Sequence, residues 1–218
     1  MTTAIVAGAT GLTGAALVRL LLSDPRFTSV TAITRRSTGV THSKFAELLV
    51  DFEQPQSWAA MVQADVVFST LGTTKKQAGS IAAQRKVDFD YQLALANAAA
   101  SNGVPCFVLL SSMGASSGSF VAYSRMKGEL EEAVDALALA RLRILRPSFL
   151  DGERAEARAG ERASILVGRL LARLGIGGNY RPIPVGTVAR AMVAAAFDAS
   201  QRQAIYSGSE LFALAESQ

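Results

Sequence analysis

The sequence predicts an α/β protein with one domain, in which a doubly wound parallel β-sheet carries helices on both faces. Short runs rich in Val, Ile and Leu alternate along the chain with longer stretches of helical periodicity. A length of 218 residues, 50% of them hydrophobic, suffices for one substantial core and leaves little room for a second. Alternation of this kind is typical of a parallel sheet flanked by helices.

The elements follow one another in a regular order. The expected strands are short apolar runs, as is typical of strands buried in a parallel sheet, and they occupy residues 3–7, 30–34, 46–50, 66–69, 106–110, 141–145 and 204–207. The expected helices, with apolar positions three or four residues apart, occupy residues 12–22, 57–62, 81–101, 123–139, 165–174 and 185–199. We expect residues 1–218 to form a single dinucleotide-binding domain, with small substrate-side elements in about 150–185.

A glycine-rich turn follows the first strand. Gly8, Gly11 and Gly14 are three residues apart and open the first helix. One glycine permits a tight turn, one lets the backbone approach a pyrophosphate, and one allows the helix to pack closely against the strand. Amides at the helix start then bind phosphate, with the helix dipole in support. This pattern predicts a Rossmann-type dinucleotide site formed by Gly8, Thr10, Gly11, Leu12, Thr13 and Gly14.

The end of the second strand indicates which dinucleotide is preferred. An acidic residue there would bind the ribose hydroxyls of NAD, but the chain has Arg35 and Arg36. Guanidinium groups pair well with a 2′-phosphate, and the local sequence offers no carboxylate to repel one. We therefore expect NADP(H) to be preferred, with NAD(H) as the alternative.

Tyr123 and Lys127 are four residues apart at the start of an expected helix, so they share one of its faces. A nearby ammonium stabilises a phenolate and lowers the pKa of the tyrosine, which makes the hydroxyl a usable acid or base. Both residues follow the strand that ends near Leu110, where ligands of such sheets bind. Of the two serines there, Ser112 is the first candidate to bind a substrate carbonyl and Ser111 the alternate.

These motifs resemble those of the short-chain dehydrogenases/reductases, which combine an early G-x-x-G-x-x-G turn with a Ser and Tyr-x-x-x-Lys group. Within that superfamily the chain is most similar to the small atypical group of Tat-interacting-protein oxidoreductases, with bacterial relatives described as NAD(P)H-binding or epimerase-like. The runs that carry the similarity are residues 69–74, 87–91, 110–115, 127–129 and 145–147, and it extends from residue 4 to about 198.

The resemblance implies further cofactor contacts. Asp51 and Phe52 would meet the adenine, and Thr70, Leu71 and Gly72 would line the ribose and pyrophosphate path. Pro147, Ser148 and Phe149 would lie beside the nicotinamide amide.

The resemblance also implies a reaction. NADPH would deliver a hydride to a carbonyl carbon, Tyr123 would protonate the oxygen, Ser112 would orient it, and Lys127 would hold the ribose and tune Tyr123. An NADP(H)-responsive binding or regulatory protein with little turnover remains an alternative, as does an NAD(P)-dependent epimerase or dehydratase. Residues after Arg146 supply less substrate region than nucleotide-sugar epimerases usually carry.

Other function classes find little support in the composition. The single histidine, His42, has no nearby metal-ligating residues, so we expect no metal site. Cys106 lies in an apolar run and is expected to be a buried hydrophobe. The net charge of +4 comes mostly from scattered arginines, so we expect no nucleic-acid partner. The expected partner is a small-molecule substrate. We expect no membrane span, a cytoplasmic location, and a monomer or homodimer.

Overall fold

The computed structural model describes residues 1–148, 150–151 and 182–217. Within them, seven parallel strands form one sheet in the order β3-β2-β1-β4-β5-β6-β9. The strands are β1 (Thr2–Ala7), β2 (Phe27–Thr34), β3 (Phe45–Leu49), β4 (Val66–Ser69), β5 (Cys106–Leu110), β6 (Leu142–Arg146) and β9 (Gln203–Ser207). This confirms the predicted doubly wound α/β fold.

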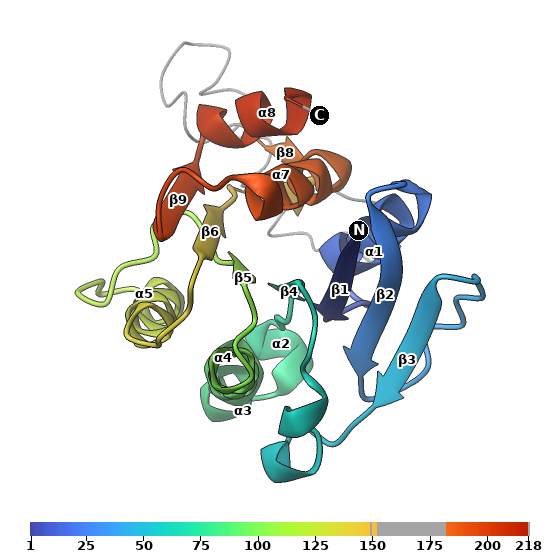
Figure 1. Ribbon diagram of the computed structural model, residues 1–218. Helices are drawn as coiled ribbons and strands as arrows, with labels where there is room; N and C mark the ends of the chain where they lie inside the picture. The colour runs from blue at the N-terminus through green and yellow to red at the C-terminus, as the bar shows by residue number, and fades with distance from the viewer. Residues whose placement is uncertain (149, 152–181, 218) are drawn as a thin grey trace.

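Helices cover both faces of the sheet (Figure 1). One face carries α1 (Leu12–Ser23), α7 (Val185–Phe197) and α8 (Ser209–Glu216), and the other carries α4 (Tyr91–Ser101) and α5 (Ala122–Asp135). Strand β1 shows why its run is apolar throughout. Ala4 and Val6 belong to the core on the α1 face, whereas Ile5 and Ala7 belong to the core on the α4 face. Because successive side chains point to opposite faces, a central strand buries apolar side chains in both cores.

The smaller elements connect these layers. They are α2 (Lys75–Ala78), α3 (Ile81–Arg85), a π-helical turn (Lys86–Asp90), two 3₁₀ turns (Pro55–Ser57 and Ala59–Met61), and the strand pair β7 (Leu150–Asp151) and β8 (Ile183–Pro184). The chain reverses its direction of winding between β1 and β4, which are neighbours in the sheet. The carboxyl ends of these two strands therefore mark the expected ligand crevice.

Some predicted elements differ from the structure. The helix expected over 57–62 is replaced by the two 3₁₀ turns, and the helix expected over 81–101 is divided by the π-helical turn. The helix expected to reach 139 ends at Asp135, and α8 was not predicted. The helix expected over 165–174 lies outside the described residues, as do most of the substrate-side elements.

Arg143 joins three elements at the amino end of the sheet. Its side chain is fully buried, and its guanidinium donates hydrogen bonds to the carbonyl oxygens of Leu142, Asp198, Gln201 and Arg202. Replacing Arg143 with methionine removes a charged donor from all four carbonyl oxygens, although Arg202 keeps the Leu142 amide and Asp198 keeps Arg141 as a donor, so we expect the free energy of unfolding to fall by about 3 kcal/mol.

Chemical denaturation of Arg143→Met measures this loss. Arg202→Gln serves as the control, because the Arg202 side chain is half-exposed in its ion pair with Asp135 and its removal should cost less than about 1 kcal/mol. Equal losses in the two variants would show that the buried network contributes little stability.

Candidate functional site

The glycine turn has the geometry that its spacing predicts. Gly8 ends β1 with a φ of +88°, and the Gly11 amide donates a 2.8 Å hydrogen bond to the Gly8 carbonyl oxygen. A Cβ on Gly14 would lie 2.1 Å from the same oxygen, so only glycine lets α1 approach the turn. Gly11 precedes the helix and supplies no side-chain cap, which leaves the amides of the first turn turned toward a ligand. This cradle fits a pyrophosphate.

The remaining residues of the turn lie around the same helix start. Thr10 is exposed, Leu12 is half-buried, and Thr13 is 4% exposed. Helix α1 has no acidic residue in its first turn, so no carboxylate opposes a bound anion there.

The segment after β4 lies against the glycine turn. Thr70 donates two hydrogen bonds to the Ala7 carbonyl oxygen, from its amide at 2.9 Å and its hydroxyl at 2.7 Å. Beyond it, Leu71 is half-buried and Gly72 is exposed. Thr70, Leu71 and Gly72 therefore leave the sheet beside the glycine turn.

Arg35 and Arg36 directly follow β2 and are both exposed. Among the described residues, neither takes part in an ion pair. The fold brings one carboxylate, that of Glu47, to the segment that follows Arg35 and Arg36, although the local sequence there contains no acidic residue. Glu47 on β3 accepts hydrogen bonds from the hydroxyls of Thr38 and Ser37 and from the Thr38 amide, and these bonds lower the pKa of its carboxyl.

The Asp51–Phe52 pair follows β3, and its two side chains have different surroundings. The Asp51 carboxylate accepts hydrogen bonds from the Glu53 amide and the Gln54 side chain. Phe52 is 3% exposed, and its ring packs against Trp58 and Tyr91, with centroids 5.5 and 5.4 Å away. The Phe52 side chain therefore belongs to the core, which leaves its main chain for contact with a cofactor.

Ser112, Tyr123 and Lys127 come together where β5 ends. Ser112 lies two residues beyond that strand, where its hydroxyl donates a 3.4 Å hydrogen bond to the Met113 carbonyl oxygen. Its side chain is also near enough to Tyr123, in the first turn of α5, to lower the pKa of the Tyr123 hydroxyl. One helical turn later, Lys127 Nζ donates a 3.3 Å hydrogen bond to the Leu110 carbonyl oxygen. Tyr123 is 38% exposed and can be reached by a substrate, whereas Lys127 is 1% exposed.

The structure also separates the two candidate serines. The Ser111 hydroxyl donates to Glu131, a buried carboxylate that Arg146 also binds through two of its nitrogens. The Ser111 hydroxyl is thus already committed to this network. The Ser112 hydroxyl lies beside that of Tyr123, which favours Ser112 for binding a substrate oxygen.

Burial is the largest influence on the pKa values of both Tyr123 and Lys127. Desolvation raises the pKa of Tyr123 to about 12, the Asp88 carboxylate acts in the same direction, and the nearby Ser112 side chain opposes both. Burial also lowers the pKa of Lys127, against the attraction of Asp88 and Glu131. The expected lowering of the Tyr123 pKa by Lys127 is therefore not seen, and Tyr123 carries its proton at neutral pH.

Asp88 and Gln92 are buried polar residues near the site that the sequence analysis did not identify as candidates. Asp88 in the π-helical turn is 1% exposed and accepts a 2.8 Å hydrogen bond from the Thr73 amide. Gln92, one turn later, donates to the Asp88 carbonyl oxygen and accepts from the Ser69 hydroxyl. Both fall on the stripe 88, 92, 95 and 99, which is otherwise apolar, and polar residues on a buried stripe are the signal that identifies them.

The segment after β6 lies beside the serine loop. Pro147 is buried, and its carbonyl oxygen accepts a 2.9 Å hydrogen bond from the Met113 amide. Ser148 follows it, and Phe149 lies outside the described residues. Pro147 and Ser148 are thus close to Ser112, in keeping with a position near the reacting part of the cofactor.

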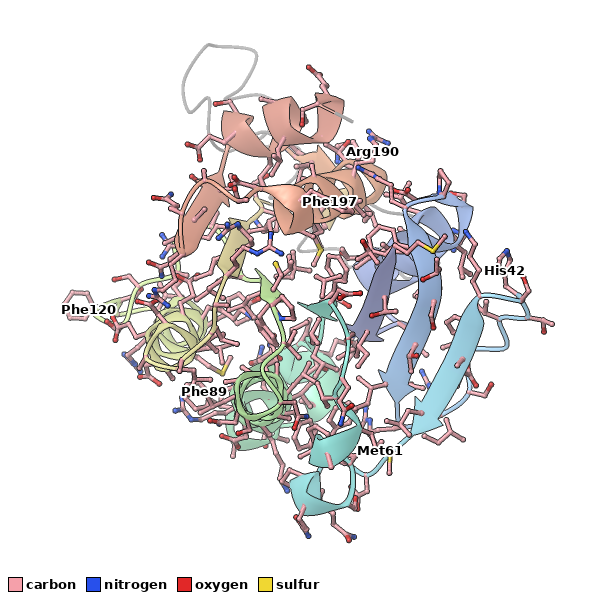
Figure 2. All side chains as sticks on the ribbon, in the orientation of Figure 1. His42, Met61, Phe89, Phe120, Arg190 and Phe197 are labelled. Atoms are coloured by element: carbon pink, nitrogen blue, oxygen red, sulfur yellow. The ribbon has the colours of Figure 1, made fainter. Side chains whose placement is uncertain are left out.

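His42 and Cys106, for which the sequence predicted no functional role, are not part of the group formed by Ser112, Tyr123 and Lys127. His42 is exposed at the tip of the connection between β2 and β3, as Figure 2 shows, and its Nδ1 accepts a hydrogen bond from the Lys44 amide. Cys106 is buried in β5, and burial raises the pKa of its thiol. Among the described residues, no three metal-ligating side chains gather, and no helix has the length and apolar character to cross a membrane.

A cavity of about 270 Å³ lies beyond Glu131, between α5, β6, β9 and the loop 115–117. None of the predicted cofactor residues lines it. Its acidic side chains already have partners, because Glu131 binds Arg146, Glu132 binds Ser117 and Asp135 binds Arg202. We assign no ligand to this cavity.

Comparisons with known proteins agree with the geometry. A family described as NAD(P)H-binding matches residues 8–199. "Protein FMP52, mitochondrial" from Coccidioides immitis is 39% identical over 172 residues, which cover 72% of this chain and 70% of that protein.

Solved structures show the same fold. MoeE5 in complex with UDP-glucuronic acid and NAD has a TM-score of 0.71 and 19% identity, over 99% of this chain and 81% of that one. A short chain dehydrogenase family protein from Francisella tularensis has a TM-score of 0.65 and 15% identity, over 96% and 98%. Together with the family match, these likenesses confirm the resemblance to atypical short-chain dehydrogenases/reductases.

The expected cytoplasmic location is wrong by the same comparisons. The Coccidioides relative and further fungal relatives are named as mitochondrial proteins. The prediction rested on the lack of a secretory signal near Met1, and that observation does not distinguish the cytosol from an organelle.

Proposed function

Because this chain belongs to the NAD(P)H-binding family, we propose that it is an NADP(H)-dependent oxidoreductase that reduces a small carbonyl compound. The observation that carries the proposal is the grouping of Ser112, Tyr123 and Lys127 at the end of β5. This group lies at the carboxyl edge of the sheet, on which the glycine turn also lies. A proton donor and a dinucleotide site at one sheet edge are what carbonyl reduction requires.

Each residue has a distinct role in this proposal. The amides at the start of α1 bind the pyrophosphate, and the bound cofactor supplies the hydride. The Tyr123 hydroxyl, protonated at neutral pH, donates its proton to the carbonyl oxygen, and the Ser112 hydroxyl orients that oxygen. Lys127 places a positive charge beneath Tyr123, which stabilises the phenolate left after proton transfer.

NADP(H) is the preferred cofactor in this proposal because Arg35 and Arg36 are exposed and without ion pairs among the described residues. Replacing both with alanine should weaken NADPH binding by about 10- to 100-fold and leave NADH binding nearly unchanged, because only NADPH carries the 2′-phosphate. Titration calorimetry with each cofactor measures the two affinities.

Arg19→Ala is a matched control, since Arg19 is an exposed arginine on α1 and should not contact the cofactor. Equal weakening of NADPH and NADH in the double variant would mean that these arginines do not read the 2′-phosphate.

Turnover is tested by following NADPH oxidation with a panel of aldehydes and ketones. Oxidation of NADPH with stoichiometric formation of alcohol supports the proposal. Two results would replace it with another function. NADPH binding without turnover of any compound favours a cofactor-responsive binding protein. Cofactor that stays bound through purification and is recycled without net oxidation favours an epimerase or dehydratase.

A further inference from the structure

Two opposite charges are buried together beneath the reaction site. Asp88 and Lys127 are each 1% exposed, and each has one hydrogen bond to the main chain, from the Thr73 amide and to the Leu110 carbonyl oxygen. Asp88 lies in the π-helical turn that packs beside α5, where Phe89, the next residue, is labelled in Figure 2. Burial raises the pKa of Asp88 and lowers that of Lys127, and in each case the charge of the other residue opposes the shift.

The other charged groups near Lys127 are already balanced. Glu131, one turn along α5, is bound by Arg146 of β6, so the positive guanidinium offsets its negative charge. Tyr123, one turn earlier, is neutral at neutral pH. Asp88 forms no ion pair with another described residue, so its field acts on Lys127 without a competing cation in direct contact.

We propose that Asp88 is a positioning residue, whose carboxylate keeps Lys127 protonated inside the core and couples that charge to the segment after β4 through Thr73. Its importance for catalysis rests on the proposed function, but the ionisation of Lys127 can be measured without turnover. Asp88 contacts the same segment as the expected cofactor path, since a Cβ on Gly72 would lie 3.5 Å from its Oδ1.

Removing the charge of Asp88 should shift the pKa values of Lys127 and Tyr123 in a direction that can be stated in advance. Without the carboxylate, the Lys127 ammonium loses an attraction and the Tyr123 phenolate loses a repulsion, so the pKa of both groups falls. Carbonyl reduction needs the proton on both residues. The alkaline limb of its pH profile should therefore move to lower pH.

The test uses Asp88→Asn, which keeps an oxygen to accept from the Thr73 amide but removes the charge. The chain has only five lysines, so NMR spectra of protein labelled with ¹³C at the lysine Cε resolve Lys127, which Lys127→Met assigns. We expect Lys127 to titrate about one pH unit or more lower in Asp88→Asn than in the wild type. Asp90→Asn, an exposed carboxylate of the same turn, should leave this titration unchanged.

An unchanged Lys127 titration in Asp88→Asn would overturn the proposal, because the carboxylate would then serve only as an acceptor for Thr73. Thermal melting gives a second measurement if that variant folds poorly. Asp88→Asn/Lys127→Met removes both charges and should melt at a higher temperature than Asp88→Asn, whereas a purely structural hydrogen bond predicts no such recovery.

Activity separates this inference from the proposed function. If a substrate is turned over, the alkaline limb should shift in Asp88→Asn and stay in place in Asp90→Asn. If no carbonyl compound is reduced but the Lys127 titration shifts as expected, the buried pair is established and the proposed reaction is wrong.

Discussion

Replacing Tyr123 with phenylalanine is expected to lower kcat for carbonyl reduction by about 10³-fold while the Kd for NADPH changes by less than about twofold. The variant loses the proton donor but keeps the ring and the glycine turn that binds the cofactor. Stopped-flow kinetics with NADPH and calorimetry on the same preparation measure the two quantities.

Tyr206→Phe is the matched control for this prediction. The Tyr206 hydroxyl bonds to Asp198, which follows α7, so its removal should leave kcat unchanged. Full turnover by Tyr123→Phe would show that another group protonates the substrate. A parallel loss of cofactor binding would instead indicate that Tyr123 is part of the dinucleotide site.

Replacing Gly14 with alanine is expected to abolish measurable NADPH binding and to lower the free energy of unfolding by about 2 kcal/mol or more. The added methyl group would lie 2.1 Å from the Gly8 carbonyl oxygen and 2.6 Å from the Thr70 hydroxyl oxygen. Helix α1 must then move away from the turn, which displaces the amides that bind the pyrophosphate. Chemical denaturation and NADPH titration measure the two losses.

Gly186→Ala controls for the change of residue type, because Gly186 lies in the first turn of α7 and a Cβ there would have no neighbour closer than 3.8 Å. That variant should be as stable as the wild type or slightly more stable. A Gly14→Ala protein with normal stability and normal NADPH affinity would contradict the close approach of α1 to the turn.

The glycine turn could be predicted because all its determinants lie in one short stretch of chain. The strand, the three glycines and the helix are consecutive within residues 2–23, and each glycine has the local geometry its position requires. The Tyr123 and Lys127 pair could be predicted for the same reason, since helical periodicity places residues four apart on one face.

Features that depend on distant parts of the chain could not be predicted. Glu47 reaches Ser37 and Thr38 because β2 and β3 are paired, and the local sequence after β2 does not show it. The ring of Phe52 is buried because Tyr91, far along the chain, stacks on it.

The backbone conformation at Asp88 could not be predicted, because helical periodicity does not reveal a π-helical turn. Residues 81–101 have the pattern of one continuous helix, and the turn Lys86–Asp90 changes the hydrogen-bond register within it. Burial raises the pKa of Asp88, and Lys127 from α5, which only the folded chain brings near, opposes that rise.

Binding of a nicotinamide dinucleotide by the start of α1 is the claim on which the other conclusions depend. Titration calorimetry of NADPH into the folded wild-type protein tests it most directly. We predict saturable binding of one NADPH per chain, tighter than that of NADH. Folded protein that binds neither dinucleotide would contradict the account.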